Sequence, residues 1–225
     1  YFYMQETFLS PNTELKTVEA TKGQMKEIFL ADGTHVWLNS DSELSFPNQF
    51  NSNNRKVELQ GEAYFEVTAN EQKPFFVKTK NHIVKVVGTR FNICEYPESH
   101  IIETTLEKGK VKIITGNIVN DLLPGEQSSF NTQTSKVRIS KTDIEIYTAW
   151  KDGRYEFRNE PLGKIFQIIE RWWDVKIDYP AKLKNERISG VLKRYKPLEE
   201  HLELIDQLVP IKYKINADQI NISLQ

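Results

Sequence analysis

The sequence predicts a mainly β N-terminal domain, of the β-sandwich, barrel or solenoid-like kind, followed by a small α+β domain built of two strand-helix-strand units. Three observations lead to this fold class. Apolar and polar residues alternate between about residues 22 and 140, turn signals separate these runs, and the apolar spacing becomes helical after Trp150. Alternation is typical of half-buried strands, whereas a period of about 3.6 residues is typical of amphipathic helices.

Alternation is clearest in two runs of the N-terminal domain. In the first run, one face carries Thr34, Val36 and Leu38, and the opposite face carries His35, Trp37 and Asn39. In the second run, one face carries Ala63, Phe65 and Val67, and the opposite face carries Glu62, Tyr64 and Glu66. One face of each strand therefore lines a core. The pair Asp32-Gly33 predicts a tight turn, and Gly61 predicts a bend before a strand. Trp37 is expected to pack across strands rather than bind a ligand.

After Trp150 the apolar spacing predicts two helices. The first carries an apolar stripe of Leu162, Ile165, Phe166, Ile169 and Trp172. We expect Asn159 to cap this helix and Pro161 to lie in its first turn. A second helix follows Pro197, and a shift of 36 residues lays Pro161 on Pro197. Each unit is a helix between two strands, and two such units can bury their apolar faces together against a small sheet.

These patterns divide the chain into three segments. We expect a lead-in segment at 1–20, the β-rich domain at 21–146 and the α+β domain at 150–225. The first residues, Tyr1-Phe2-Tyr3-Met4, have no basic region and are not a signal peptide. Two interpretations of them stay open, the outer end of a removed membrane segment and an ordinary strand or arm.

Composition excludes several classes of protein. With 30 basic and 31 acidic residues the net charge is -1, which argues against nucleic acid as a partner. Cys94 is the single cysteine, so no internal disulfide framework exists. No run of 18 apolar residues is present. The four histidines, His35, His82, His100 and His201, lack metal-ligand spacing, and we expect no metal, no cofactor and no catalytic residues.

Several motifs resemble the FecR family of anti-sigma factors. The segment 30–40 (Leu-Ala-Asp-Gly-Thr-His-Val-Trp-Leu-Asn-Ser) looks like the opening signature, and 61–67 (Gly-Glu-Ala-Tyr-Phe-Glu-Val) continues it. Further matches are 74–77, 87–93 and 124–127, in the same order. From Trp150 onward the chain is similar to the C-terminal domain of such proteins, and its repeat resembles the short signalling domain of TonB-dependent transducers and secretins.

The resemblance implies a three-part protein. A cytoplasmic domain absent from this chain would hold an extracytoplasmic-function sigma factor, and an absent transmembrane helix would cross the inner membrane. The present chain would be the periplasmic sensor, tethered to that membrane, and would receive a signal from the signalling domain of a TonB-dependent outer-membrane receptor. It would not be an enzyme. An alternative function, from the residues alone, is a non-catalytic ligand- or glycan-binding β-sandwich with an accessory α+β domain.

Two further predictions concern individual residues. Some members of the family cleave themselves at a Gly-Thr bond, so Gly88-Thr89 is a candidate for self-cleavage; the simpler interpretation is a glycine at a strand break. For partner binding we expect an open strand edge at the end of the chain, where Ile220, Ile222 and Leu224 form an apolar row. The segment 187–193 is a second candidate edge, and Trp173 and Tyr213 are candidates for choice of partner.

Overall fold

The computed structural model describes residues 14–225, which fall into two compact units. The first unit extends to Ile144, and the second contains residues 145–225 together with Lys22–Gln24. Most of the expected lead-in segment, residues 1–13, lies outside the described residues. The chain is mainly β, with 50% strand and 17% helix, as the sequence predicts.

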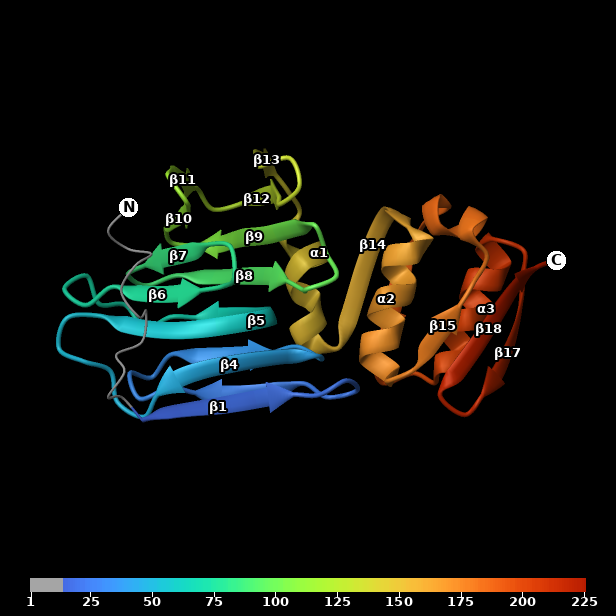
Figure 1. The fold of residues 1–225 in the computed structure, drawn as a ribbon, viewed down its shortest axis with the longest axis horizontal. Helices are drawn as coiled ribbons and strands as arrows, with labels where there is room; N and C mark the ends of the chain where they lie inside the picture. The colour runs from blue at the N-terminus through green and yellow to red at the C-terminus, as the bar shows by residue number, and fades with distance from the viewer. Residues whose placement is uncertain (1–13) are drawn as a thin grey trace. The chain divides into compact units, whose positions relative to one another are not determined.

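The first unit is built almost entirely of strands. They are β1 (Leu15–Ala20), β2 (Lys26–Phe29), β3 (His35–Leu38), β4 (Ser42–Pro47), β5 (Arg55–Glu66), β6 (Phe75–Lys78), β7 (Ile83–Val86), β8 (Arg90–Glu95), β9 (Ile101–Lys108), β10 (Val111–Thr115), β11 (Ile118–Leu122), β12 (Glu126–Asn131) and β13 (Lys136–Lys141). They form one 13-stranded sheet that is nearly closed and barrel-like (Figure 1).

The long strand β5 belongs to both halves of this sheet. Its first half pairs with β4 and, in parallel, with β6, and its second half pairs with β3 and β8. The two halves meet at Gly61, which has φ of 93°. A Cβ at this position would collide with Ser42 Oγ, so only glycine fits. The expected bend at Gly61 is therefore the point where the sheet turns over its own core.

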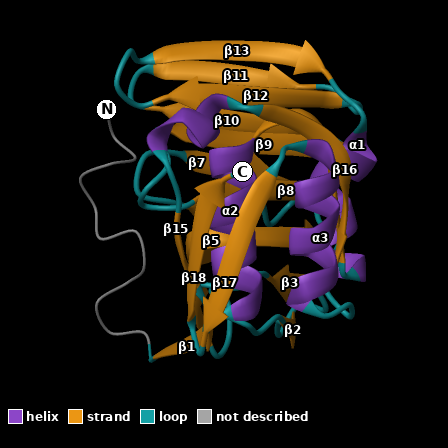
Figure 2. Cartoon of the chain, turned by 90° about the vertical axis from the view of Figure 1, so that its right-hand side faces the viewer, coloured by secondary structure: helices purple, strands orange, loops and turns teal. Residues whose placement is uncertain are grey.

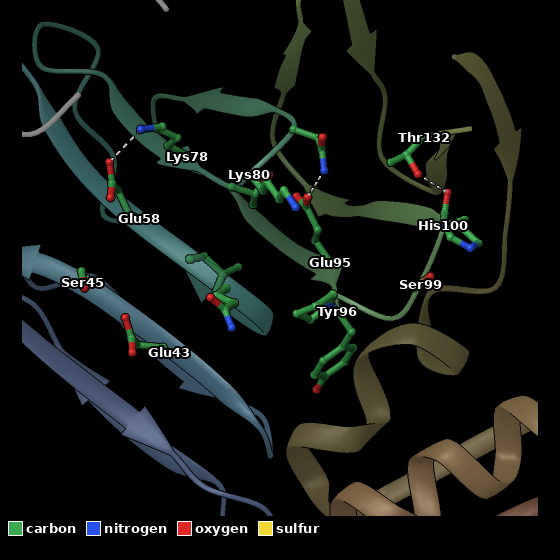
Figure 3. A pocket seen from close by; sticks show the side chains of 15 residues that line it. Glu43, Ser45, Glu58, Lys78, Lys80, Glu95, Tyr96, Ser99, His100 and Thr132 are labelled. Carbon is green, nitrogen blue, oxygen red and sulfur yellow. Dashed lines mark hydrogen bonds and ion pairs between the residues drawn. The ribbon is translucent and has the colours of Figure 1, made fainter. Parts of the chain in front are cut away.

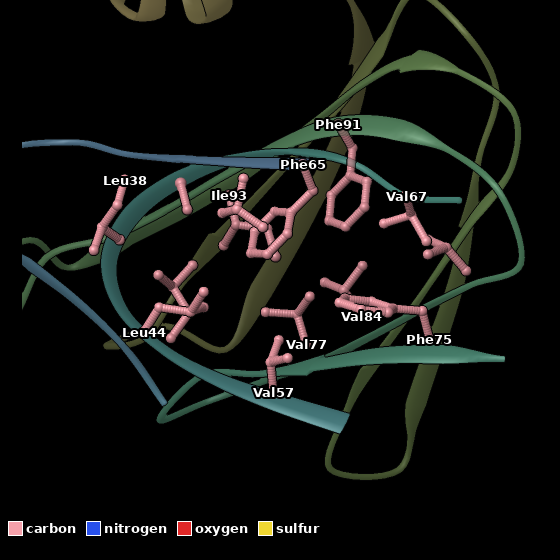
Figure 4. Packing of buried hydrophobic residues seen from close by; sticks show 14 of the residues in the cluster. Leu38, Leu44, Val57, Phe65, Val67, Phe75, Val77, Val84, Phe91 and Ile93 are labelled. Carbon is pink, nitrogen blue, oxygen red and sulfur yellow. The ribbon is translucent and has the colours of Figure 1, made fainter. Parts of the chain in front are cut away.

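Figure 4 shows the apolar core between the two halves of the sheet. Phe65 on β5 and Phe91 on β8 stack with their ring centroids 5.1 Å apart, and Phe75 on β6 lies 6.3 Å from Phe65. Fully or almost fully buried aliphatic residues complete the core from several strands: Leu38, Leu44, Val57, Val77, Val84 and Ile93. The alternation in the sequence identified the inward faces of β3 and of the second half of β5 correctly.

A buried ion pair that the sequence did not reveal holds the turn at Asp32-Gly33. Gly33 has φ of 82°, as a tight turn requires. The Arg55 guanidinium, whose residue is 1% exposed, donates from Nη1 to Asp32 Oδ2 at 2.7 Å and to the Thr68 carbonyl at 2.7 Å. Arg55 Nε also donates to the Lys73 carbonyl. Removing the Asp32 carboxylate would leave the Arg55 charge buried without a counter-ion, so the pair is structural.

The second unit contains the two expected strand-helix-strand repeats. Its elements are α1 (Ile144–Thr148), η1 (Ala149–Asp152), β14 (Arg154–Pro161), α2 (Leu162–Trp173), β15 (Lys176–Asp178), η2 (Ala181–Asn185), β16 (Arg187–Lys193), α3 (Leu198–Leu208), β17 (Ile211–Asn216) and β18 (Gln219–Leu224). The expected apolar stripe of α2 is buried throughout.

Two details of this unit differ from the sequence prediction. The strands form two sheets rather than one, a two-stranded β14-β16 sheet and a three-stranded β15-β18-β17 sheet. Pro161, not Asn159, is the N-cap of α2. Asn159 instead has φ of 52° at a register shift in β14, where its N–H donates to Ser189 Oγ at 2.8 Å. The bulge contains one extra residue of β14, and the strand continues through it to Pro161, so Asn159 lies within the strand and does not cap the helix.

Candidate docking surface of the C-terminal unit

The terminal strand β18 is not an open edge, and this expectation was wrong. It lies in the middle of its sheet: it pairs with β17 along its whole length and, in parallel, with β15 from Gln219 to Asn221 (Figure 2). The hairpin at Ala217, which has φ of 52°, returns β18 alongside β17. Residues at the end of a chain can be covered by strands that precede them, and here β15 and β17 both do so.

The apolar row of β18 is real, but it faces the domain's own core. Ile220 is fully buried and Ile222 is 6% exposed, whereas Leu224 is 37% exposed. Ile222 lies opposite Tyr213 of β17, and opposite residues in an antiparallel pair share a face. That face packs on α3. Burial, and then Glu203, Glu199 and Asp206 of α3, raise the pKa of Tyr213 on this face. Ile220 and Ile222 are therefore core residues of this unit.

Among the described residues this sheet has two outer strands, β15 and β17, and each pairs with β18 alone. The edge of β17 is the longer, with six residues against three in β15. The two-residue hairpin makes Asn216 and Gln219 a hydrogen-bonded pair, and such pairs alternate along an antiparallel ladder. Lys212 and Lys214 consequently bond to β18, whereas the backbone N–H and C=O of Tyr213 and Ile215 point outward. The same alternation aims the Ile211 N–H outward, where it meets Asp206 Oδ1 at 3.0 Å.

The side chains of β17 divide between its two faces. Lys212 and Lys214 are exposed on the face away from α3, and Tyr213 is half-buried on the face toward it. Lysines along an edge disfavour pairing with arbitrary strands, because a partner must tolerate or complement their charge. The β17 edge therefore offers backbone groups for pairing, and Lys212 and Lys214 restrict the strands that can pair with it.

Trp173 lies at the junction of the two repeats. Its ring centroid is 5.0 Å from that of His201 on α3 and 5.9 Å from that of Trp172. His201 is buried, and its Nε2 lies 3.0 Å from the Lys193 carbonyl at the end of β16. Trp173 is half-buried, so it contributes to packing between α2 and α3 and also leaves part of its ring at the surface. Its role in partner choice stays a prediction.

The second candidate edge, residues 187–193, corresponds to β16. It pairs with β14 on one side, with a register shift between Phe157 and Glu160. The shift twists this two-stranded sheet and interrupts its ladder. We therefore regard the regular, six-residue β17 as the better template for an added strand.

The Gly88-Thr89 bond lies in a tightly packed turn between β7 and β8. A Cβ on Gly88 would stand 2.7 Å from Ala69 Cα, so packing alone explains this glycine. Thr89 is 4% exposed, and its hydroxyl donates to the Lys110 carbonyl at 3.0 Å. A hydroxyl held in this way is not paired with a general base. The mass of the purified protein tests whether this bond is cleaved.

Other residues singled out in the sequence take part in the packing of the β-rich unit. The Trp37 ring packs edge-on against Tyr64 of the neighbouring strand, at 5.6 Å, as expected for a cross-strand contact. Glu62 accepts hydrogen bonds from Asn39 Nδ2 at 2.8 Å and Asn92 Nδ2 at 2.9 Å, so it ties β3 and β8 to β5. Within residues 14–225 no group of three or more His, Cys, Asp or Glu could hold a metal ion.

Comparison with known proteins covers both units. The family model described as FecR protein matches residues 16–112, and the model described as FecR, C-terminal, matches residues 154–222. A crystal structure at 1.65 Å resolution of a candidate anti-sigma factor from Parabacteroides distasonis has a TM-score of 0.86 and 30% identity, and covers 93% of this chain and 99% of its own. A second structure so described, at 2.50 Å, has a TM-score of 0.87 and 30% identity, and covers 94% and 100%.

A search of curated protein sequences finds no match. The β-rich unit, the repeated C-terminal unit and the similarity to these solved structures indicate that the chain is an anti-sigma factor. It belongs to the FecR family.

Proposed function

We propose that the chain is the periplasmic sensor part of a transmembrane anti-sigma factor and acts without catalysis. It regulates an extracytoplasmic-function sigma factor through a cytoplasmic domain outside this chain. The observation that carries the proposal is the match of both units to the FecR family, together with neighbours that share the whole two-unit architecture. No helix among residues 14–225 is long and apolar enough to cross a bilayer.

The signal reaches this chain from the signalling domain of a TonB-dependent outer-membrane receptor, and the second unit receives it. The strand β17 supports this step, because Tyr213 and Ile215 direct unpaired backbone groups outward while Lys212 and Lys214 supply charge. An added strand from the receptor domain would gain backbone hydrogen bonds along this edge. Acidic side chains on that strand would complement the two lysines.

The experiment compares Tyr213→Pro with Tyr213→Ala. Both substitutions remove the ring, but only proline removes the outward N–H, and neither removes a hydrogen bond to β18. Calorimetric titration of the cognate receptor's signalling domain should give an affinity at least about tenfold lower for the proline variant, which corresponds to about 1.4 kcal/mol. Circular dichroism should show both variants folded.

Two outcomes would contradict parts of this proposal. Equal affinities for the folded proline and alanine variants would exclude the β17 edge and leave the surface around Trp173 to be tested. If the unaltered chain does not bind the receptor domain at all, reception of a receptor signal is wrong. Substituting Ile222 would be uninformative, since Ile222 is buried in the central strand.

A further inference from the structure

The β-rich unit contains a cavity that the proposed function does not use. Its volume is about 710 Å³, within the range of about 300 to 1,000 Å³ that small-molecule sites occupy. Strands β4 and β5 supply one wall, the end of β6 with its following turn supplies another, and the end of β8 supplies the third. Figure 3 shows side chains from these strands around it. All lining residues belong to the first unit.

A buried carboxyl group lies on the wall of this cavity. Glu95, at the end of β8, is 8% exposed, and burial raises the pKa of its side chain. Oε1 accepts a hydrogen bond from Asn81 Nδ2 (Figure 3), and the Thr79 hydroxyl and the Asn81 N–H lower the pKa of the carboxyl against this burial. Oε2 itself makes no hydrogen bond of regular geometry. A buried oxygen without a donor is unfavourable, so the protein retains here a group that a ligand donor would satisfy.

The remaining lining side chains indicate the chemistry of the ligand. Glu58 is already paired with Lys78 at 3.0 Å, and burial favours the uncharged form of Glu95, so Glu43 and Lys80 remain as opposite charges in the lining. Lys80 disfavours a cation and Glu43 disfavours an anion. Hydroxyl and amide groups make up much of the rest of the lining: Ser45, Gln60, Thr79, Asn81, Ser99 and Thr132. Such a lining suits a ligand that is neutral and both donates and accepts hydrogen bonds.

The Tyr96 ring of the wall is not available for stacking. Tyr96 is 4% exposed, and its hydroxyl donates to the Ser40 carbonyl at 2.9 Å, so the ring packs within the fold. The imidazole of the exposed His100 is the other aromatic ring of the lining. A metal ion does not fit, since residues 14–225 contain no cluster able to hold one.

We propose that this cavity binds a small, uncharged polyhydroxylated molecule of the size of a mono- or disaccharide, one hydroxyl of which donates to Glu95 Oε2. Because that oxygen is closed to bulk water in this structure, side chains around Glu95 must move to admit the hydroxyl. The Asn81 side-chain amide, which bonds the same carboxyl, therefore reports on binding.

The test uses glucose, N-acetylglucosamine and maltose as neutral probes, ethanolamine as a cationic probe and inorganic phosphate as an anionic probe. Amide NMR of the full chain should show saturable shifts with at least one neutral probe, including the Asn81 side-chain amide. Neither charged probe should compete. Glu95→Gln should weaken the binding at least tenfold, whereas Glu71→Gln, at an exposed position outside the cavity, should leave it unchanged.

A second variant keeps the test decisive if Glu95→Gln does not fold. Gln60→Trp places a large side chain in the cavity from an exposed position on β5 and leaves Glu95 intact, so it should abolish the shifts. Absence of binding by all three sugars, binding that survives Gln60→Trp, or preference for ethanolamine or phosphate would overturn the proposal. None of these results depends on the receptor domain, so they are distinguishable from failure of the proposed function.

Discussion

His82 offers a quantitative test of the packing in the β-rich unit. The residue is 3% exposed, its Nδ1 lies 3.1 Å from Thr115 Oγ1, and its ring packs 5.8 Å from that of Phe130. Nε2 has no hydrogen-bond partner. Burial lowers the pKa of His82 from 6.5 to about 4, because a charged imidazole would be poorly solvated there.

The sign of the pH effect follows from this shift. Below pH 6.5 the unfolded chain binds a proton at His82 while the folded protein still excludes it, so unfolding becomes more favourable as the pH falls toward 4. Between pH 7.5 and pH 4.5 the free energy of unfolding should decrease by about 2.5 kcal/mol through this residue. Glu95, whose pKa burial raises, acts in the opposite direction, since its contribution to stability is lost as the pH rises through its folded pKa.

The assay is urea unfolding of the wild type and of His82→Asn at both pH values. Asparagine keeps a polar atom near the position of Nδ1 but does not titrate, and both proteins retain Glu95, so its effect cancels in the difference. The indole N–H resonance of Trp37 in the NMR spectrum reports on the β-rich unit alone, because Trp37 lies in that unit. The free energy of unfolding of the wild type minus that of His82→Asn should be about 2.5 kcal/mol smaller at pH 4.5 than at pH 7.5. A difference that stays constant within about 0.5 kcal/mol would refute the buried, neutral His82.

Two further outcomes are expected. Residues 145–225 should fold without the β-rich unit, because α2 and α3 bury their apolar faces against strands of the same unit; a collapsed amide NMR spectrum for this fragment, with dispersion restored only in the whole chain, would contradict that. Purified protein should have the intact mass, because the Thr89 hydroxyl is committed to the Lys110 carbonyl; two fragments that meet at Thr89 and disappear in Thr89→Ala would show self-cleavage instead.

The sequence by itself determined the faces and the order of the elements. Alternation along 34–39 and 61–67 identified the buried side of β3 and β5, and the helical spacing after Trp150 identified α2 and its repeat. It also placed the bend at Gly61 and the turn at Asp32-Gly33. These features follow from local rules, because side-chain direction and the need for positive φ depend on neighbouring residues alone.

Only the tertiary structure decided which strands and charges meet. An apolar row such as that of Ile220 and Ile222 looks the same in a central strand as in an edge strand, because both bury one face. The strands that pair with β18 are β15, more than 40 residues earlier, and β17. The Arg55–Asp32 pair and the burial of Glu95 likewise depend on strands distant in sequence. Alternation specifies a face but carries no information about a pairing partner, since the ladder is formed by backbone groups common to all residues.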